Sequence, residues 1–179
     1  MEPPDSREAT PQERAFTDAA TSRLSKYLVG FLKLGIQNGI EHVLPAGSGT
    51  LVKFRKHHGI LTAAHVLSAL PKHGDVGIVR FFSRGLERTK LRMEDTYTKS
   101  AGGQDGVDGP DLGFLGLSPD VVGSLKAASD FFDFDKYSDQ ILSHQGPKPG
   151  FDAVLGMIAE KSRVEFSGMT AKSFFSGEH

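Results

Sequence analysis

The sequence predicts a mainly β protein that is preceded by an N-terminal helix. From residue 40 onward, short apolar runs alternate with Gly, Pro and Asp, a texture typical of strands joined by tight turns. Before residue 40, apolar side chains recur at helical spacing instead. The chain has 179 residues, of which 38% are hydrophobic, so it is long enough and apolar enough to form one packed domain or slightly more.

The first predicted element is a helix over residues 11–36. Thr10 can cap this helix, Pro11 suits its first position, and Glu13 can complete a capping box. Apolar residues then follow at helical spacing: Ala20, Leu24, Tyr27, Leu28 and Phe31. We therefore expect the helix to dock on the β domain through the last part of this series, Leu24, Leu28 and Phe31. The polar residues 1–10 are predicted to form a disordered tail.

The β domain is predicted to cover residues 40–130. Its strand-like runs are His42 to Leu44, Gly49 to Phe54, Gly59 to Leu61, Val76 to Phe82, Lys90 to Tyr97 and Leu112 to Leu117. Two short helices fit between and after these strands, one from Ala63 to Leu70 with Thr62 as its cap and one from Asp120 to Ala128 after Ser118. Residues 100–110 contain too few apolar side chains for anything but a loop.

Residues 131–150 are predicted to be a linker. The aromatic rings between Phe131 and Phe134 are expected to tuck onto the β domain, and Gly146 to Gly150 is typical of a stiff connector. Two further strand-like runs come next, Ala153 to Ile158 and Ser162 to Ser167. They predict that residues 151–179 begin a second, incomplete β unit.

Two residues beside strand ends could carry chemistry. His65 lies in the sequence TAAHV, directly after the strand that ends at Leu61, where a hairpin would anchor it rigidly. Asp111 ends a glycine-rich loop and immediately precedes the strand that begins at Leu112. Taken alone, a histidine at a helix start or an aspartate beside a proline is usually structural. A catalytic base needs a rigid anchor, which the hairpin would give His65, and two such residues at strand ends mean more as a pair than either does alone.

Three segments together resemble the first half of a trypsin-like (chymotrypsin-fold) serine peptidase of the bacterial, cysteine-free type: GSGTLV at 47–52, GILTAAHV at 59–66 and PDLGFLGL at 110–117. A softer match at 151–164 resembles the family's opening strand of a second barrel. The resemblance implies a six-stranded antiparallel β-barrel over residues 40–130, followed by the start of an incomplete second barrel. It also implies that His65 is the general base of a Ser-His-Asp triad and that Asp111 orients its imidazole, within hydrogen-bonding reach.

The nucleophile of that family lies in a Gly-x-Ser-Gly-Gly turn, and this sequence does not occur in the chain. The implied spacing puts the serine at about residue 200. Ser176 lacks the flanking glycines and Ser48 precedes the histidine, so both are poor substitutes. Three interpretations stay open: a serine-type endopeptidase truncated before its nucleophile and inactive as given, a non-catalytic interaction domain on a trypsin-like scaffold, or another chemistry.

Composition narrows the expected location and partners. A net charge of -1 disfavours a nucleic-acid binder that works through a basic surface, and the most apolar window is too short to span a membrane. The start of the chain does not read as a secretory signal and there is no cysteine, which is typical of a cytoplasmic protein. The expected partner is a peptide or protein substrate, and strands of the incomplete second barrel could also self-associate.

The implied chemistry needs no cofactor, and the sequence predicts no metal site. His57 and His58 are adjacent on a predicted hairpin, so their side chains should point to opposite faces. The segment from Asp105 to Gly109 is rich in aspartate and glycine, but the downstream glutamate of a calcium-binding EF-hand is missing.

Overall fold

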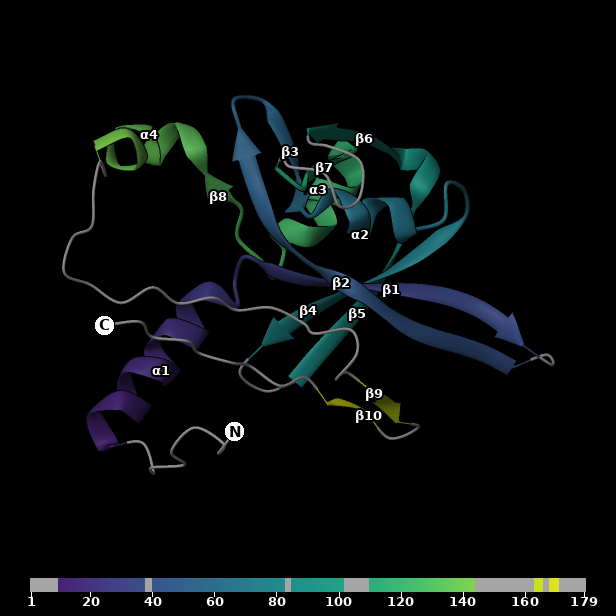
Figure 1. Ribbon diagram of the computed structural model, residues 1–179, viewed down its shortest axis with the longest axis horizontal. Coiled ribbons are helices and arrows are strands. Elements are labelled where there is room, and N and C mark those ends of the chain that lie inside the picture. Colours follow the sequence, from purple (N-terminus) through teal and green to yellow (C-terminus); the bar gives the residue numbers. More distant parts are fainter. Residues whose placement is uncertain are drawn as a thin grey trace, which may run out of the picture.

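The computed structural model describes residues 10–37, 40–82, 85–101, 110–143, 163–165 and 168–170 (Figure 1). The described fold is mainly β, as predicted: its main sheet has eight strands, antiparallel except for the short strand β8, and it is accompanied by four helices. The strand order is β5-β4-β1-β2-β3-β7-β6, and the short strand β8 adds to β2. Within the described residues, β5 and β6 end the sheet and do not pair with each other, so the sheet is not closed.

The principal strands have these bounds: β1 Leu28–Gln37, β2 Ile40–Phe54, β3 His57–Thr62, β4 Asp75–Phe82, β5 Gly85–Arg92, β6 Thr96–Ala101 and β7 Leu112–Leu117. The core lies between these strands. Its fully buried members come from neighbouring strands and include Phe31, Leu51, Ile60, Ile78 and Leu115. Each such side chain contributes about 1.5–3 kcal/mol of burial free energy, which makes this cluster the main source of stability.

The N-terminal helix is shorter than predicted. Helix α1 (Pro11–Leu24) begins with the expected capping box between Thr10 and Glu13, but it ends at Leu24 and buries none of its residues. The residues expected to dock it, Leu28 and Phe31, belong instead to β1 and are buried in the core. The prediction of a helix to residue 36 is therefore wrong, and the sheet begins at residue 28 rather than 40.

The sequence LVGFLKLGIQ explains why residues 28–37 form a strand and not a continuation of the helix. It carries two glycines, which weaken a helix, and its apolar residues are nearly continuous, as in a strand that is buried on both faces. Leu24, Leu28 and Phe31 happen to share helical spacing, but β1 pairs with β2 on one side and β4 on the other. Tertiary pairing thus overrides a local pattern that fits both structures.

Strand β2 unites two of the predicted strands, because the run from Ile40 to Phe54 is continuous. Its register with β1 shifts at Phe31 and Leu32, opposite the segment that contains Pro45. A bulge of this kind accommodates a proline, which cannot donate to the ladder. A turn at Arg55 and Lys56 then leads into β3, and Arg55 takes a positive φ of 53° there.

The predicted strand from Lys90 to Tyr97 is two strands. Strand β5 ends at Arg92, the 3₁₀ turn η1 (Met93–Asp95) comes next, and β6 begins at Thr96. The turn is fixed by Met93, which is buried and whose backbone N–H donates to the Gly74 carbonyl at 2.9 Å. The chain bends at this point, so that β5 pairs with β4 whereas β6 pairs with β7.

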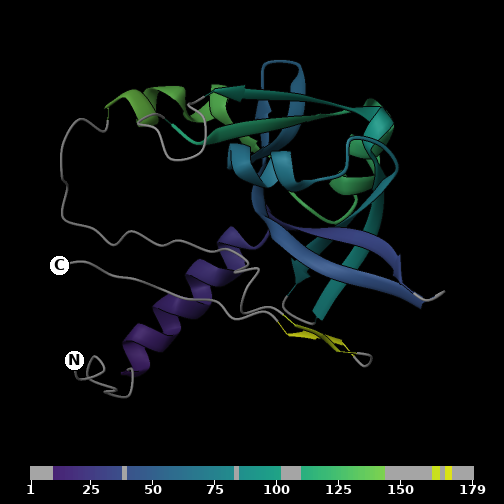
Figure 2. The same cartoon turned by 45° about the vertical axis from the view of Figure 1, so that its right-hand side comes forward.

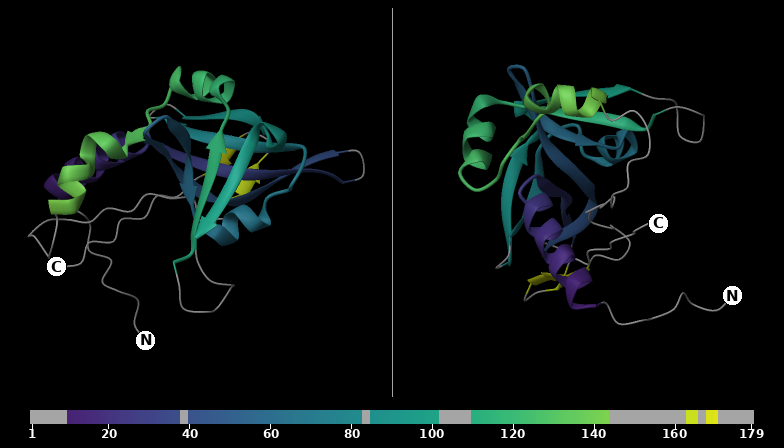
Figure 3. Two further views of the ribbon diagram at one scale, coloured as in Figure 1. Left: turned by 90° about the horizontal axis from the view of Figure 1, so that it is seen from above. Right: turned by 90° about the vertical axis from the view of Figure 1, so that its left-hand side faces the viewer.

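Residues 131–143 of the predicted linker form regular structure. Strand β8 (Phe132–Asp133) runs parallel to β2, and helix α4 (Phe134–Ser143) comes directly after it. The Phe131 ring packs against the core, as expected. The backbone is held as well by the pairing of β8 with β2, and Lys53 Nζ donates to the Asp133 carboxylate at 2.5 Å. Helices α1 and α4 both extend to one side of the sheet, on the left in Figure 1 and in the left panel of Figure 3.

Strands β9 (Arg163–Glu165) and β10 (Gly168–Thr170) form a separate antiparallel pair, drawn in yellow in Figures 1 and 2. β9 lies within the strand predicted from Ser162 to Ser167. The predicted strand from Ala153 to Ile158, most of the predicted tail and the end of the chain lie outside the described residues. No helix in the described part is long and apolar enough to cross a membrane.

Candidate active site

The pairing of β3 with β7 creates the site. These strands are antiparallel, and Thr62 at the end of β3 lies opposite Gly113 near the start of β7. Helix α2 (Ala64–Ala69) begins just after β3, and Asp111 comes just before β7. The start of α2 and the residue before β7 are therefore brought to the same edge of the sheet, which is the placement that the sequence predicted for His65 and Asp111.

The His65 and Asp111 side chains are in direct contact. The Nδ1 of His65 bonds to Oδ2 of Asp111, and the backbone N–H of His65 donates to Oδ1 at 3.0 Å. The prediction that the two residues lie within hydrogen-bonding reach is confirmed. Because an ionised carboxylate can only accept, Nδ1 carries the proton, and the neutral imidazole presents an unprotonated Nε2. An imidazole held in this tautomer can take a proton from a neighbouring hydroxyl.

Asp111 also caps the helix that carries His65. Helix α2 has no side-chain cap of its own at Ala63, and the predicted cap Thr62 bonds elsewhere. The Asp111 carboxylate accepts from the backbone N–H of His65 and interacts with that of Ala64, so it satisfies donors that the first turn would leave unpaired. One carboxylate thus fixes both the backbone of the first turn and the imidazole ring.

These contacts lower the pKa of Asp111. The largest cause is the hydrogen bond from the His65 imidazole, followed by the hydrogen bond from the His65 backbone N–H. The two side chains are 60% and 50% exposed, so water and a substrate can reach them. Asp111 consequently stays ionised at neutral pH, as an orienting carboxylate must.

The GSGT segment of β2 packs closely against α2 and β3. Gly47 has a positive φ of 146°, and a Cβ at this position would lie 2.7 Å from the side chain of Val66 in α2. The Thr62 hydroxyl donates to the Ser48 carbonyl at 2.6 Å, and Thr62 is only 8% exposed. A Cβ at Gly49 would lie 2.5 Å from Ile60. The glycines are therefore required for close approach, and they seat β3 and α2 firmly on β2.

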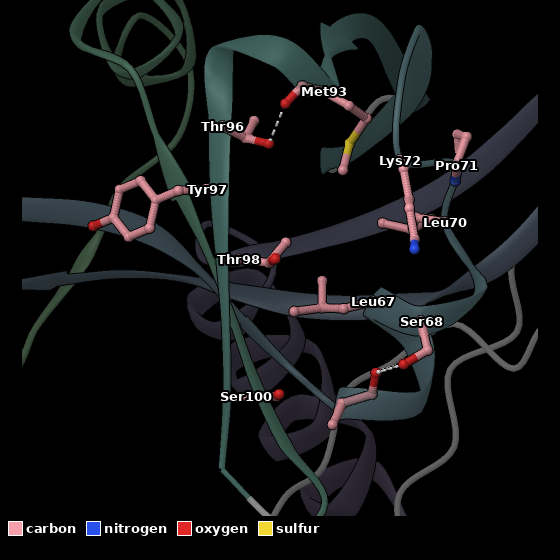
Figure 4. Close-up of a pocket in the computed structure, with 11 residues that line it drawn as sticks. Leu67, Ser68, Leu70, Pro71, Lys72, Met93, Thr96, Tyr97, Thr98 and Ser100 are labelled. Atoms are coloured by element: carbon pink, nitrogen blue, oxygen red, sulfur yellow. Dashed lines mark hydrogen bonds between the residues drawn. The ribbon is translucent and has the colours of Figure 1, made fainter.

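A pocket of about 410 Å³ lies beside α2, between this helix and β6. Figure 4 shows Thr96, Thr98 and Ser100 facing Leu67 and Ser68 across it, whereas the Tyr97 ring points away. The Ser68 hydroxyl donates to the Ala64 carbonyl in its own helix at 3.1 Å. His65 does not line this pocket, so the serines found here do not face its imidazole.

The remaining sequence candidates are not brought to the site as nucleophiles. Ser48 contributes its carbonyl to the support of Thr62, and Ser176 lies outside the described residues. Among the described side chains, none with a hydroxyl bonds to the imidazole of His65. No group of three His, Asp or Glu side chains in the described ranges is placed to hold a metal ion, and the Asp105 segment is outside these ranges.

Sequence reasoning identified the two side chains but missed their backbone contacts. The role of Asp111 as a cap for a helix far away in sequence could have been suspected from Ala63-Ala64, since alanine offers no capping oxygen. The bond between Thr62 and Ser48 has no signature in the sequence, because it depends on the register of β2 against β3.

Comparisons of the chain with known protein families, with curated proteins and with solved structures give no match.

Proposed function

We propose that this chain carries the general base and its orienter of a serine-type endopeptidase. His65 is the base, Asp111 is the orienter, and the substrate is a peptide or a protein. The observation that supports this proposal most strongly is the bond between Nδ1 of His65 and the Asp111 carboxylate, which leaves Nε2 as the reactive nitrogen. The resemblance of the GSGTLV, TAAH and PDLGFL segments to trypsin-like peptidases supports the same assignment.

The sheet offers a second line of support. Its two ends are β5 and β6, which are consecutive in the chain and joined only by the η1 turn. If β5 and β6 are counted as one bent strand, β1 to β7 amount to six strands, and the path of the sheet returns to its beginning. We propose that this arrangement is the six-stranded antiparallel barrel of a trypsin-like peptidase, with η1 as its corner. Barrels commonly turn their corners at such local bends.

The proposed mechanism rests on the charges and protons of the pair. Nε2 of His65 removes the proton of a serine hydroxyl as that oxygen attacks the peptide carbonyl, and it later returns the proton to the leaving amine. Asp111 stabilises the imidazolium and keeps its proton on Nδ1, but does not itself become protonated. The nucleophile and the oxyanion-hole donors are not assigned to any described residue in this proposal. No metal or organic cofactor takes part.

An interaction domain on a trypsin-like scaffold is the second candidate. The sequence observation that favours it is that no Gly-x-Ser-Gly-Gly occurs among the 179 residues. In this alternative, His65 and Asp111 are kept because the carboxylate caps α2, and the pair has no chemical task. The two candidates predict different coding sequences downstream of codon 179. A Gly-x-Ser-Gly-Gly sequence in that reading frame would favour the peptidase, and a coding sequence without it would favour the interaction domain.

The direct test uses purified residues 1–179, a fluorophosphonate probe for activated serines and a casein substrate. We expect neither labelling nor turnover, because the sequence has no Gly-x-Ser-Gly-Gly turn to supply a nucleophile and an oxyanion hole, and loss of one oxyanion-hole donor alone costs roughly 10²–10³ in rate. Stoichiometric labelling that disappears in His65→Ala would show that a serine of this chain already completes the triad.

The pair itself is tested by proton NMR. In the unaltered chain, the Nδ1 proton of His65 should give a strongly deshielded resonance because the Asp111 carboxylate accepts it. Asp111→Asn should abolish this resonance, whereas Asp139→Asn, an exposed position in α4, should leave it unchanged. A resonance that persists in Asp111→Asn would remove the proposed orienter.

A further inference from the structure

A second pocket lies at the other end of β3, where the turn from β2 enters this strand. It has a volume of about 360 Å³, within the range of small-molecule sites. Its walls come from the β2–β3 turn and the start of β3, from Tyr97 of β6, from Leu117 of β7 and from helix α3 (Pro119–Lys126). Strand β3 has six residues, so this pocket is about 20 Å from the His65 end and separate from it.

Four basic side chains line the pocket: Lys56, His57, His58 and Lys126. No carboxylate is among the residues that line it. The whole chain has a net charge of -1, so this concentration of positive charge does not reflect a basic protein. None of the ion pairs found within the described residues involves Lys56 or Lys126. The nearby Asp133 carboxylate is already bonded to Lys53 Nζ.

His58 is the innermost of these groups. Its Nε2 is buried and has no hydrogen-bond partner among the described residues. Its ring meets the Phe131 ring edge-on at 5.0 Å, and Lys126 Nζ lies 5.9 Å from the centre of the same phenyl ring. Burial, followed by the charges of Lys126 and Lys53, lowers the pKa of His58. A buried polar nitrogen without a partner is costly, and the lysine charges that lower the pKa of His58 make its surroundings electropositive, which favours an anion.

Tyr97 supplies a hydroxyl to the same pocket. Figure 4 shows its ring directed away from Thr96 and Thr98, and its hydroxyl lies 3.3 Å from Nδ1 of His57. The ring reaches this position by crossing Gly116, where a Cβ would approach it to 2.2 Å. The remaining walls are apolar and include Leu117, Pro119 and Val122. The pocket thus combines cationic and hydroxyl donors with an aromatic and aliphatic surface.

We propose that this pocket binds a phosphate monoester whose phosphate is carried on a compact apolar or aromatic body. The phosphate lies between Lys56 and Lys126, which offer the charge-assisted hydrogen bonds that a dianion requires, beside the histidines that line the same pocket. The body packs against the Tyr97 ring and the apolar face of α3. This site is independent of the proposed peptidase chemistry, because it shares no residue with the His65–Asp111 pair.

The experiment titrates residues 1–179 with phenyl phosphate, inorganic phosphate and phenol, and follows the backbone and imidazole NMR signals. We expect phenyl phosphate to bind most tightly, inorganic phosphate less tightly and phenol not measurably, with the largest shifts at His57, His58 and Tyr97.

Variants locate the site. Lys56→Gln and Lys126→Gln should each weaken phenyl phosphate binding about tenfold or more, whereas the matched control Lys90→Gln, an exposed position in β5, should leave it unchanged. Thermal unfolding of each variant verifies that the fold is intact. Equal binding of phenol and phenyl phosphate, equal affinity in all three variants, or the absence of shifts at His57 and His58 would each overturn the proposal.

Discussion

The two ends of β3 hold histidines in opposite electrostatic settings. At one end His65 meets the carboxylate of Asp111, which fixes its tautomer and leaves Nε2 unprotonated in the neutral ring. At the other end His57 and His58 face Lys56 and Lys126, with no carboxylate in the pocket wall. The comparison teaches that the partner, rather than the residue type, decides what a histidine can do. A carboxylate partner fixes the tautomer of a neutral histidine, whereas cationic neighbours lower the pKa of His58.

The largest expected effect comes from breaking the strand that both ends share. Ile60 lies in the middle of β3 and is fully buried. Ile60→Ala should lower the free energy of unfolding by about 2–5 kcal/mol, because it leaves a cavity in the core. Denaturant unfolding measures this loss. The exposed Leu112→Ala in neighbouring β7 is the matched control and should cost about 1 kcal/mol or less. Similar losses in both variants would contradict the central role of β3.

Thr62→Val should affect the His65 end alone. The valine keeps the shape of the side chain but leaves the Ser48 carbonyl without its donor, at a position that is only 8% exposed. We expect a loss of about 1–3 kcal/mol in the free energy of unfolding. The NMR signals of His65 should shift, whereas those of His58 should not. Thr62→Ser retains the hydroxyl and should preserve the His65 signals. A shift at both ends would show that the two sites are coupled.

The pH dependence of the stability of Asp111→Asn distinguishes the contribution of the Asp111 charge from its contribution as a helix cap, because asparagine can still accept from the first turn of α2. The pKa of Asp111 is lowered in the folded state, so its carboxylate stabilises the protein above its ordinary value of 3.8. This contribution disappears as the pH falls from 3.8 through the lowered value. Thermal unfolding should therefore show the unaltered chain to be more stable than the variant at pH 6, with the difference shrinking below pH 3.8. A difference that does not vary with pH would contradict an ionised pair.

The smallest effect is expected for His58→Phe at the other end of β3. The phenyl ring keeps the edge-on contact with Phe131 and removes the unpartnered Nε2, so stability at pH 8 should change by about 1 kcal/mol or less.

The sign of the pH effect at His58 is opposite to that of a paired histidine. Because the pKa of His58 is lowered in the folded state, the unfolded chain binds the proton more readily as the pH falls through 6.5. The unaltered chain should lose stability relative to the variant between pH 7 and pH 5, in a buffer without phosphate. A gain of stability over this range would mean that a carboxylate faces His58 after all.

Much of the β domain could be predicted from the sequence, because its strands are bounded by turn residues and its core residues are apolar. The strands around Gly59 to Leu61 and Leu112 to Leu117 are found close to their predicted bounds. Strand β1 could not be separated from a helix, since Leu24, Leu28 and Phe31 satisfy helical spacing and the deciding contacts come from β2 and β4. The division between β5 and β6 was also hidden, because Met93 turns the chain through its burial in the core.

The two side chains of the site could be predicted from the sequence, but the hydrogen bonds that hold the backbone around them could not. His65 and Asp111 stand beside predicted strand ends, and pairing of those strands brings them together. The cap at α2 was assigned to Thr62 because a hydroxyl directly before a short helix usually serves there. The hydroxyl instead turns toward the Ser48 carbonyl, and only the three-dimensional pairing of β2 with β3 reveals this choice.

The cap of α2 has a consequence for the order in which the chain folds. A helix of six residues is too short to persist alone, and the carboxylate that completes its first turn arrives 46 residues later. The chain must therefore close the loop between His65 and Asp111 before the Asp111 carboxylate can fix the orientation of the imidazole. The Asp111 carboxylate reaches His65 only where β7 pairs with β3. The pairing of β3 with β7 thus brings His65 and Asp111 together, and a chain that lacks β7 carries no oriented histidine.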